Sequence, residues 1–216
     1  MRVALIGGTG LIGSLLAPKL LAAGHELHLL QRRAGAGEGA TLHVAPPADW
    51  PALVRRIAPE AAISALGSTM KQAGSQAAFR AVDRDIVLAF AAAAREAGAT
   101  RMATVSSVGA DSASKTFYLR IKGETDAALE ALNFPRLDIF RPGLLRGARG
   151  GERRRGERLA ILASPLVNLV LQGPLDRFAA IDAEHVAAAI AASLTGPASG
   201  LRRYQNRQIR AAATGR

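Results

Sequence analysis

Three glycines near the start of the chain constrain its fold more than any other feature. They form the pattern Gly7-x-x-Gly10-x-x-Gly13, between an apolar run, Val3 to Ile6, and an apolar helical pattern, Leu11 to Ala23. Glycine suits such a junction because the chain must turn tightly and bring helix and strand together without intervening side chains. The helix N-terminus then presents free N–H groups and a partial positive charge to an anion. The junction predicts a strand–turn–helix unit that binds a dinucleotide pyrophosphate.

Short apolar runs alternate with longer helical patterns along the chain, as expected for repeated βα units around a mostly parallel sheet. The predicted strands are Val3–Ile6, Glu26–Gln31, Thr41–Val44, Ala61–Leu66, Arg101–Val105, Arg136–Phe140 and a short Leu201–Tyr204. The predicted helices are Leu11–Ala23, Trp50–Ile57 capped by Asp49, Gln76–Ala97, Ser114–Leu132, Leu159–Leu171, Asp182–Leu194 and one that starts near Asn206. The first six strands predict an α/β fold, a doubly wound parallel sheet of order 3-2-1-4-5-6, which is the Rossmann fold.

Length and composition are those of an ordinary globular protein. The 216 residues can bury one core, 49% of them are hydrophobic, and no linker composition separates a second domain. We expect a single domain with a core over residues 1–145 and a small C-terminal, substrate-side extension over residues 146–216. Cysteine is absent and the four histidines lack metal-site spacing, so we expect neither a disulfide nor a metal.

The charge and the N-terminal segment bear on location and partners. Glycines interrupt the N-terminal segment, and no apolar run reaches the roughly 18 residues of a membrane span, so we expect a cytoplasmic protein without a membrane partner. The net charge is +11, and an arginine-rich loop runs from Arg146 to Arg158. This loop could cover an anionic substrate or contact a partner, although such runs are commonly solvated. We expect no nucleic-acid partner, because a solvated basic surface explains the charge.

The end of the second strand decides which nicotinamide dinucleotide fits. NAD-binding folds place a carboxylate about 20 residues after the glycine turn, where it holds the ribose 2′-hydroxyl. This chain has Gln31, Arg32 and Arg33 there. Two guanidinium groups suit the 2′-phosphate of NADP, because arginine forms charge-assisted and often bidentate bonds with phosphate. The sequence therefore predicts NADP(H) as the cofactor, and the alternative is two ordinary surface arginines.

A tyrosine and a lysine provide candidate acid/base chemistry. Tyr118 and Lys122 are four residues apart on a predicted helix and so share one face, while Ser106 and Ser107 follow the fifth strand at the carboxyl edge of the sheet. A phenol ordinarily ionises at about pH 10, and a nearby ammonium favours its phenolate. We expect Tyr118 to exchange a proton with the substrate, Lys122 to support it and hold the nicotinamide ribose, and Ser107 to position the substrate oxygen.

Seven segments, in order over about two thirds of the chain, carry a resemblance to a known family. They are GGTGLIG near the start, QRR after the second strand, LGST (66–69), AVDRD (81–85), SSVGAD (106–111), YLRIKGE (118–124) and FRPGLL (140–145). In combination they resemble the short-chain dehydrogenase/reductase superfamily. The specific similarity is to its atypical branch, which includes the Tat-interacting oxidoreductase-like and the NAD(P)-dependent epimerase/dehydratase-like proteins.

The resemblance implies a catalytic set of Ser107, Tyr118 and Lys122 and NADP(H) as the ligand. It also implies cofactor contacts from Gly7, Thr9, Gly10, Leu11, Ile12, Gly13, Arg32, Arg33, Leu66, Gly67, Tyr118, Lys122 and Pro142. Many active relatives carry an asparagine that supports a proton relay in the helix after the fourth strand, whereas the comparable stretch here begins at Ala81. The chain is also shorter after Lys122 than in sugar-nucleotide epimerases, so epimerase activity is not expected.

Three functions remain open at this point. The first is an NADP(H)-dependent oxidoreductase that acts on a small carbonyl or hydroxyl substrate by hydride transfer, with Tyr118 as acid/base. The second is a non-catalytic NADP(H)-binding regulatory or interaction module that acts on a protein partner, which the missing asparagine favours. The third is a polyanion-binding protein that works through the arginine-rich loop. A homodimer is compatible with each, and no sequence feature identifies the substrate.

Overall fold

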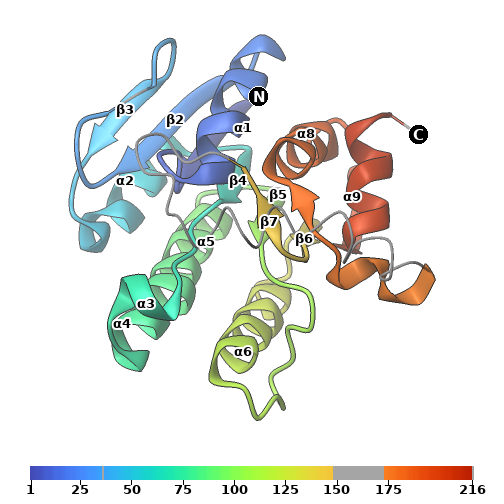
Figure 1. The fold of residues 1–216 in the computed structure, drawn as a ribbon. Helices are drawn as coiled ribbons and strands as arrows, with labels where there is room; N and C mark the ends of the chain where they lie inside the picture. The colour runs from blue at the N-terminus through green and yellow to red at the C-terminus, as the bar shows by residue number, and fades with distance from the viewer. Residues whose placement is uncertain (36, 148–172, 216) are drawn as a thin grey trace.

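A computed structural model describes residues 1–35, 37–147 and 173–215 of the chain. Its centre is a seven-stranded parallel sheet in the order β3-β2-β1-β4-β5-β6-β9 (Figure 1). The strands are β1 (Arg2–Ile6), β2 (Glu26–Gln31), β3 (Thr41–Val44), β4 (Ala61–Ser64), β5 (Arg101–Val105), β6 (Arg136–Phe140) and β9 (Gly200–Tyr204). A second, two-stranded sheet consists of β7 (Leu145–Arg146) and β8 (Ile181–Asp182).

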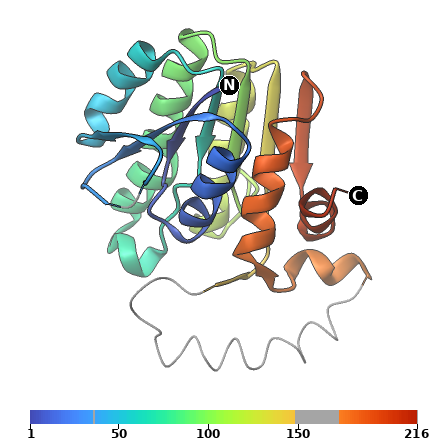
Figure 2. The same ribbon diagram turned by 90° about the horizontal axis from the view of Figure 1, so that it is seen from above.

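Helices cover both faces of the large sheet, which Figure 2 shows between two helical layers. One layer contains α1 (Leu11–Ala22) and α8 (Ala183–Ser193), and α9 (Asn206–Ala213) packs against α8. The other layer contains α2 (Trp50–Ile57), α5 (Ile86–Glu96) and α6 (Phe117–Ala131). The shorter elements are the 3-10 turns η1 (Pro47–Asp49) and η3 (Gly173–Phe178), the helices α3 (Met70–Ala73) and α4 (Gln76–Arg80), and the π-helical turn η2 (Ala81–Asp85).

The apolar run Val3–Ile6 lies in β1, which separates two hydrophobic cores. Side chains alternate along a strand, so β1 directs Val3 and Leu5 toward α1 and α8, and Ala4 and Ile6 toward α2 and α5. None of these four side chains has any exposed surface. A strand covered by helices on both faces therefore reads as continuously apolar rather than alternating.

The predicted strand order 3-2-1-4-5-6 is confirmed, and β9 extends it beside β6. The predicted fourth strand is too long. β4 ends at Ser64, because the next residues pass directly against the glycine turn: a Cβ on Gly7 would lie 2.5 Å from the Ala65 carbonyl carbon. The predicted cap of α2 also differs. Asp49 precedes the helix, but it already has helical backbone angles as part of η1, and its side chain caps no N–H.

The predicted helix over Gln76–Ala97 is interrupted, and this interruption matters for the site. The chain passes from α4 into η2 before α5 begins, and a π-helical turn holds one residue more than an α-helical turn. Before α4, the separate helix α3 starts at a capping box of Thr69 and Gln72 and stops at Gly74, whose φ is +78°. The predicted helix over Ser114–Leu132 begins later, as α6 at Phe117.

Some predictions fall where no structure is described. The arginine-rich loop beyond Gly147 and the helix expected over Leu159–Leu171 lie outside the described residues. Within the described ranges, no helix combines the length and the apolar character that a membrane crossing requires. The same ranges contain no cluster of histidine, aspartate or glutamate side chains with the arrangement of a metal site.

Candidate functional site

The turn between β1 and α1 requires glycine at two points. Gly7 has a φ of +82°, which side chains of L-residues rarely adopt, and a Cβ on Gly13 would lie 2.1 Å from the Gly7 carbonyl oxygen. The Gly10 N–H donates to that same carbonyl at 2.9 Å, and among the described residues no side chain caps the first N–H groups of α1. The turn thus leaves the helix N-terminus open to an anion.

A cleft of about 170 Å³ opens in front of this helix, at the carboxyl edge of the sheet. It is lined by Gly10, Leu11, Ile12, Ala65, Leu66, Gly67, Ser68, Thr69, Val105, Ser106, Tyr118, Lys122 and Leu145. These residues come from the glycine turn and α1, from the segments after β4 and β5, from α6 and from β7. Ligands of doubly wound sheets bind at this edge, so the cleft lies where the fold favours a site.

The cleft brings together only part of the predicted set. Its lining includes the predicted residues Gly10, Leu11, Ile12, Leu66, Gly67, Tyr118 and Lys122. Gly7 lies in the turn behind it, Gly13 in the first turn of α1, and Thr9 is exposed beside it. Pro142 is buried after β6, where its carbonyl accepts the Val108 N–H at 3.0 Å and so holds the segment after β5.

Lys122 is buried together with a carboxylate that sequence reasoning missed. Its Nζ lies 2.8 Å from Oδ1 of Asp83, and the two side chains are only 7% and 0% exposed. The other carboxylate oxygen of Asp83 accepts the Ser68 N–H at 2.9 Å and the Ser68 hydroxyl at 2.6 Å. The sequence signal for this carboxylate is Asp83 in the AVDRD segment (81–85), a segment interpreted above only through the asparagine that it lacks.

The adjacent serines after β5 differ in their surroundings. Ser106 lines the cleft, and its hydroxyl donates to Asp126 at 2.9 Å. Arg141 also binds this carboxylate, with Nη2 at 2.7 Å. Burial raises the pKa of Asp126, although the charge of Arg141 opposes the rise. Ser107 does not line the cleft, and its hydroxyl donates to the neighbouring Val108 carbonyl at 3.2 Å.

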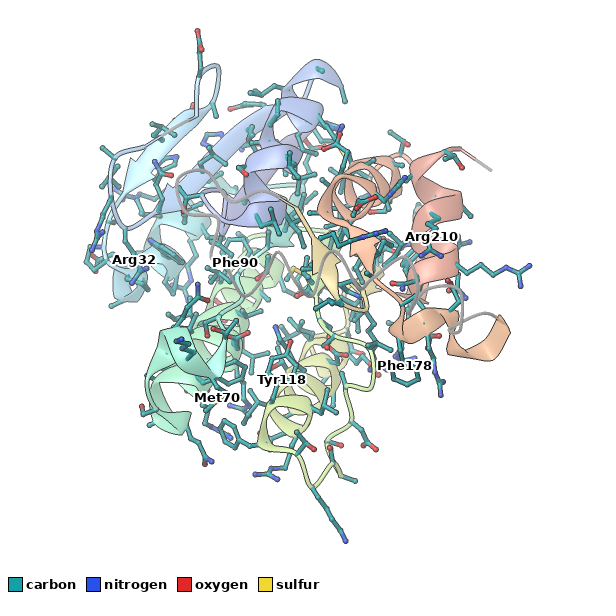
Figure 3. The ribbon with its side chains drawn as sticks, viewed as in Figure 1. Arg32, Met70, Phe90, Tyr118, Phe178 and Arg210 are labelled. Atoms are coloured by element: carbon teal, nitrogen blue, oxygen red, sulfur yellow. The ribbon has the colours of Figure 1, made fainter. Side chains whose placement is uncertain are left out.

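Tyr118 lies in the first turn of α6, with its ring 5.5 Å from that of Phe79. Figure 3 shows it near Met70 of α3, whereas Arg32 lies well away, beyond the end of β2. A second glycine contact fixes this part of α6. A Cβ on Gly123 would lie 2.2 Å from the Ser112 backbone nitrogen, so the helix can approach the loop after β5 only because this residue is glycine.

The end of β2 contains unused polar groups. Gln31 is 5% exposed, yet neither atom of its amide has a hydrogen-bond partner among the described residues. Arg32 and Arg33 are exposed, and within the same residues neither forms an ion pair or a side-chain hydrogen bond. This position therefore combines a buried neutral amide with two guanidinium groups that are free to bind an anion.

The chain is similar to known proteins both in sequence and in fold. The model of the NAD dependent epimerase/dehydratase family matches residues 3–126. The mitochondrial protein FMP52 of Meyerozyma guilliermondii is 37% identical over 202 residues, 90% of this chain and 86% of that protein. Protein HTATIP2 of Rattus norvegicus is 46% identical over 95 residues, 44% of this chain and 38% of that protein. A UDP-glucose 4-epimerase of Thermus thermophilus, solved with NAD, shares the fold: its TM-score is 0.70 at 19% identity, covering 100% of this chain and 83% of that one.

The expected cytoplasmic location is wrong. Several fungal relatives, that of Meyerozyma guilliermondii among them, are named as mitochondrial proteins. The expectation rested on the glycines in the N-terminal segment and on the lack of an apolar run long enough to span a membrane. Neither feature distinguishes a cytoplasmic protein from a mitochondrial one.

Proposed function

Since the chain belongs to the NAD dependent epimerase/dehydratase family and has the NAD(P)-dependent oxidoreductase type of function, we propose that it is an NADP(H)-dependent oxidoreductase of a small carbonyl or hydroxyl substrate. One observation carries the proposal: the first turn of α1 and the Tyr118–Lys122 face of α6 line the same cleft. A dinucleotide with its pyrophosphate on the glycine turn can extend from the end of β2 to this face.

The residues present fit such a cofactor. Gly7 and Gly13 allow the turn to close tightly, because a Cβ on either residue would clash with backbone atoms at 2.5 or 2.1 Å, and the closed turn presents the N–H groups of α1 to a pyrophosphate. The side chain at Gln31 is a neutral amide, buried and without a partner among the described residues, so it places no negative charge beside a neighbouring phosphate. Arg32 and Arg33 supply positive charge for the 2′-phosphate, and this supports a preference for NADP(H) over NAD(H).

The chemistry divides between the cofactor and the chain. When bound, the nicotinamide supplies or accepts the hydride. The Tyr118 hydroxyl donates the proton to the substrate oxygen in reduction and takes it back in oxidation, while the Lys122 ammonium favours the phenolate and binds the ribose hydroxyls. The resemblance implies that Ser107 positions the substrate oxygen, but the cleft lining favours Ser106 for this role.

The cofactor assignment is tested by calorimetric titration with NADPH and, separately, with NADH. We expect clear binding of NADPH, weaker binding of NADH, and loss of this preference in Arg32→Ala/Arg33→Ala. That double variant should bind NADH as the wild-type protein does, because NADH has no 2′-phosphate. Equal affinity for the two cofactors, or affinity for neither, would contradict the assignment.

The acid/base assignment is tested with Tyr118→Phe. NADPH oxidation is followed with a panel of small aldehydes and ketones, and the variant should lose turnover while its affinity for NADPH stays within a few fold of wild type. Turnover that persists in Tyr118→Phe would show that another group carries the proton.

One observation favours a second candidate function, a non-catalytic NADP(H)-binding module. The carboxylate of Asp83 offsets the Lys122 ammonium, so less net positive charge faces Tyr118 than in a site with an unpaired lysine. Such a module would bind NADPH but would turn over no carbonyl or alcohol substrate. Its Tyr118→Phe variant would then bind NADPH as the wild-type protein does, and neither protein would turn over a substrate.

A further inference from the structure

Asp83 is a buried carboxylate at the meeting point of three segments. It lies in η2, is 1% exposed, and contacts the segment after β4 through Ser68 and the helix α6 through Lys122. Its backbone carbonyl accepts the Thr125 hydroxyl at 3.2 Å, which fastens η2 to α6 a second time. Within the same π-helical turn, Asp83 is buried, whereas Asp85 lies at the surface, paired with Arg84 at 2.9 Å.

We propose that Asp83 is a positioning residue: its carboxylate holds the Lys122 ammonium at the cleft, offsets its charge, and so sets the pH at which the Tyr118 phenolate forms. The inference rests on the proposed function, because Tyr118 matters as the acid/base of that reaction. Its physical consequence can nevertheless be measured on the protein alone, without substrate or turnover.

The burial of both charges makes the electrostatic coupling strong. A buried ammonium without a partner is costly, and the contact of 2.8 Å with Asp83 compensates it directly. Lys122 and Tyr118 share a helix face and both line the cleft, so the field of the ammonium reaches the phenol. The carboxylate opposes that field, and removing its charge must favour loss of a proton from the tyrosine–lysine pair.

Other charged groups near the pair are compensated by partners of their own. Asp126 binds Arg141, and Glu124 binds both Arg80 and Arg84. A substitution confined to Asp83 leaves these two groups of charges in place, and the Phe79 ring beside Tyr118 is uncharged. A change in phenolate formation would therefore report the Asp83 charge itself.

The same carboxylate also anchors a segment proposed to contact the cofactor. Its Oδ2 atom accepts two hydrogen bonds from Ser68, and the residues just before Ser68 are Leu66 and Gly67. One side chain thus connects the lysine on α6 with the loop after β4. Oδ1 of Asp83 contacts Lys122 and Oδ2 accepts from Ser68, so a substitution at Ser68 can test the second contact without removing the first.

The experiment is an ultraviolet titration of phenolate absorbance in the cofactor-free protein. The chain contains only two tyrosines, Tyr118 and Tyr204, so each ionisation step can be assigned to its residue by substitution. Tyr118→Phe checks that assignment by removing the Tyr118 step. In Asp83→Asn we expect the Tyr118 step to move to lower pH by about one unit. The matched control Asp85→Asn removes an exposed carboxylate from the same turn and should leave the step unmoved.

Two further variants complete the test. Ser68→Ala keeps the ion pair and should weaken NADPH binding several fold while the phenolate step stays in place. If Asp83→Asn does not fold, the paired variant Asp83→Asn/Lys122→Met must fold, because it leaves no uncompensated buried charge. An unmoved step in a folded Asp83→Asn, or failure of the paired variant to fold, overturns the inference. A moved step without turnover of any substrate would leave the inference standing and remove the proposed enzymatic function instead.

Discussion

Asn206, the first residue of α9, binds Gly143 at the end of the chain segment that leaves β6. Its Oδ1 accepts the Gly143 N–H at 2.9 Å, and its Nδ2 donates to the carbonyls of Asp176 and Ala179. Asn206 is fully buried, and Gly143 has no room for a side chain: a Cβ would lie 2.3 Å from the Ala179 carbonyl oxygen. One amide therefore holds the C-terminal part of the chain against the segment that leads into β7 and the cleft.

Replacing this amide should be costly. Asn206→Ala leaves the Gly143 N–H and two carbonyls without their partner in a buried place, and we expect a loss of about 2–4 kcal/mol in the free energy of unfolding. Urea denaturation followed by circular dichroism measures it. Arg207→Ala, an exposed position on the same helix, should change stability little. Equal stability of the two variants would mean that the segments are held by other contacts.

Substitutions of the two serines after β5 should differ in their effect on kcat. Ser106→Ala removes the hydroxyl that lines the cleft and binds Asp126, and we expect kcat to fall at least about tenfold. Ser107→Ala removes a hydroxyl whose one partner within the described part of the chain is its neighbour's carbonyl, and we expect a smaller loss. Steady-state kinetics with NADPH compares them on one substrate. A larger loss in Ser107→Ala would restore the role that the family resemblance implies.

Gly123→Ala tests the close contact between α6 and the loop after β5. Alanine is the better helix former by about 1 kcal/mol, yet its Cβ would lie 2.2 Å from the Ser112 nitrogen, which is backbone and cannot simply rotate away. The clash should dominate and reduce stability by about 3 kcal/mol. Thermal denaturation measures the change, with Gly35→Ala as the control, because the nearest atom to a Cβ there is 3.8 Å away. A stabilised Gly123→Ala would show that the loop moves aside easily.

His43 should make stability depend on pH. Burial, with smaller contributions from the charges of His28 and Arg56, lowers the pKa of His43 below its ordinary 6.5. The folded protein therefore resists protonation there: the contribution to stability is complete above about pH 6.5 and is lost as the pH falls toward the lowered pKa. His43→Gln should reduce the loss of stability between pH 7 and pH 5, as measured by urea denaturation at several pH values. A pH profile that keeps its wild-type slope in the variant would contradict this role.

Much of the fold could be predicted because local patterns and tertiary contacts agree. The run Val3 to Ile6 is apolar at every position because helices cover both faces of β1. Glycine is required at Gly13 and Gly7 because a Cβ there would lie 2.1 and 2.5 Å, respectively, from backbone atoms. Such features leave a local signal in the sequence, an apolar run and regularly spaced glycines, even where the contacts that require them come from distant segments. The glycine turn, the two arginines after β2 and the Tyr118–Lys122 spacing were recognisable for the same reason.

The parts that were missed depend on small local changes in geometry. Asp83 is buried within a single π-helical turn, and no apolar periodicity distinguishes that turn from a continuous helix. Adjacent residues at the end of a strand point in different directions, so a difference of one position separates Ser106 from Ser107 at the cleft. The pairing of β9 with β6 joins residues far apart in the sequence, and a short, exposed strand provides little signal for it.

The packing of α8 against α1 has a consequence for the order in which the protein can mature. The side chains of Ile12, Leu16 and Leu20 on α1 share a core with Val186 and Ile190 of α8, and Lys19 reaches Glu184 at 2.6 Å. During synthesis, the glycine turn and α1 leave the ribosome well before α8, the helix that packs against them. Until α8 follows, the nascent chain exposes an apolar stripe on α1, and the first turn of α1 acquires its final rigidity only when the two helices pack together.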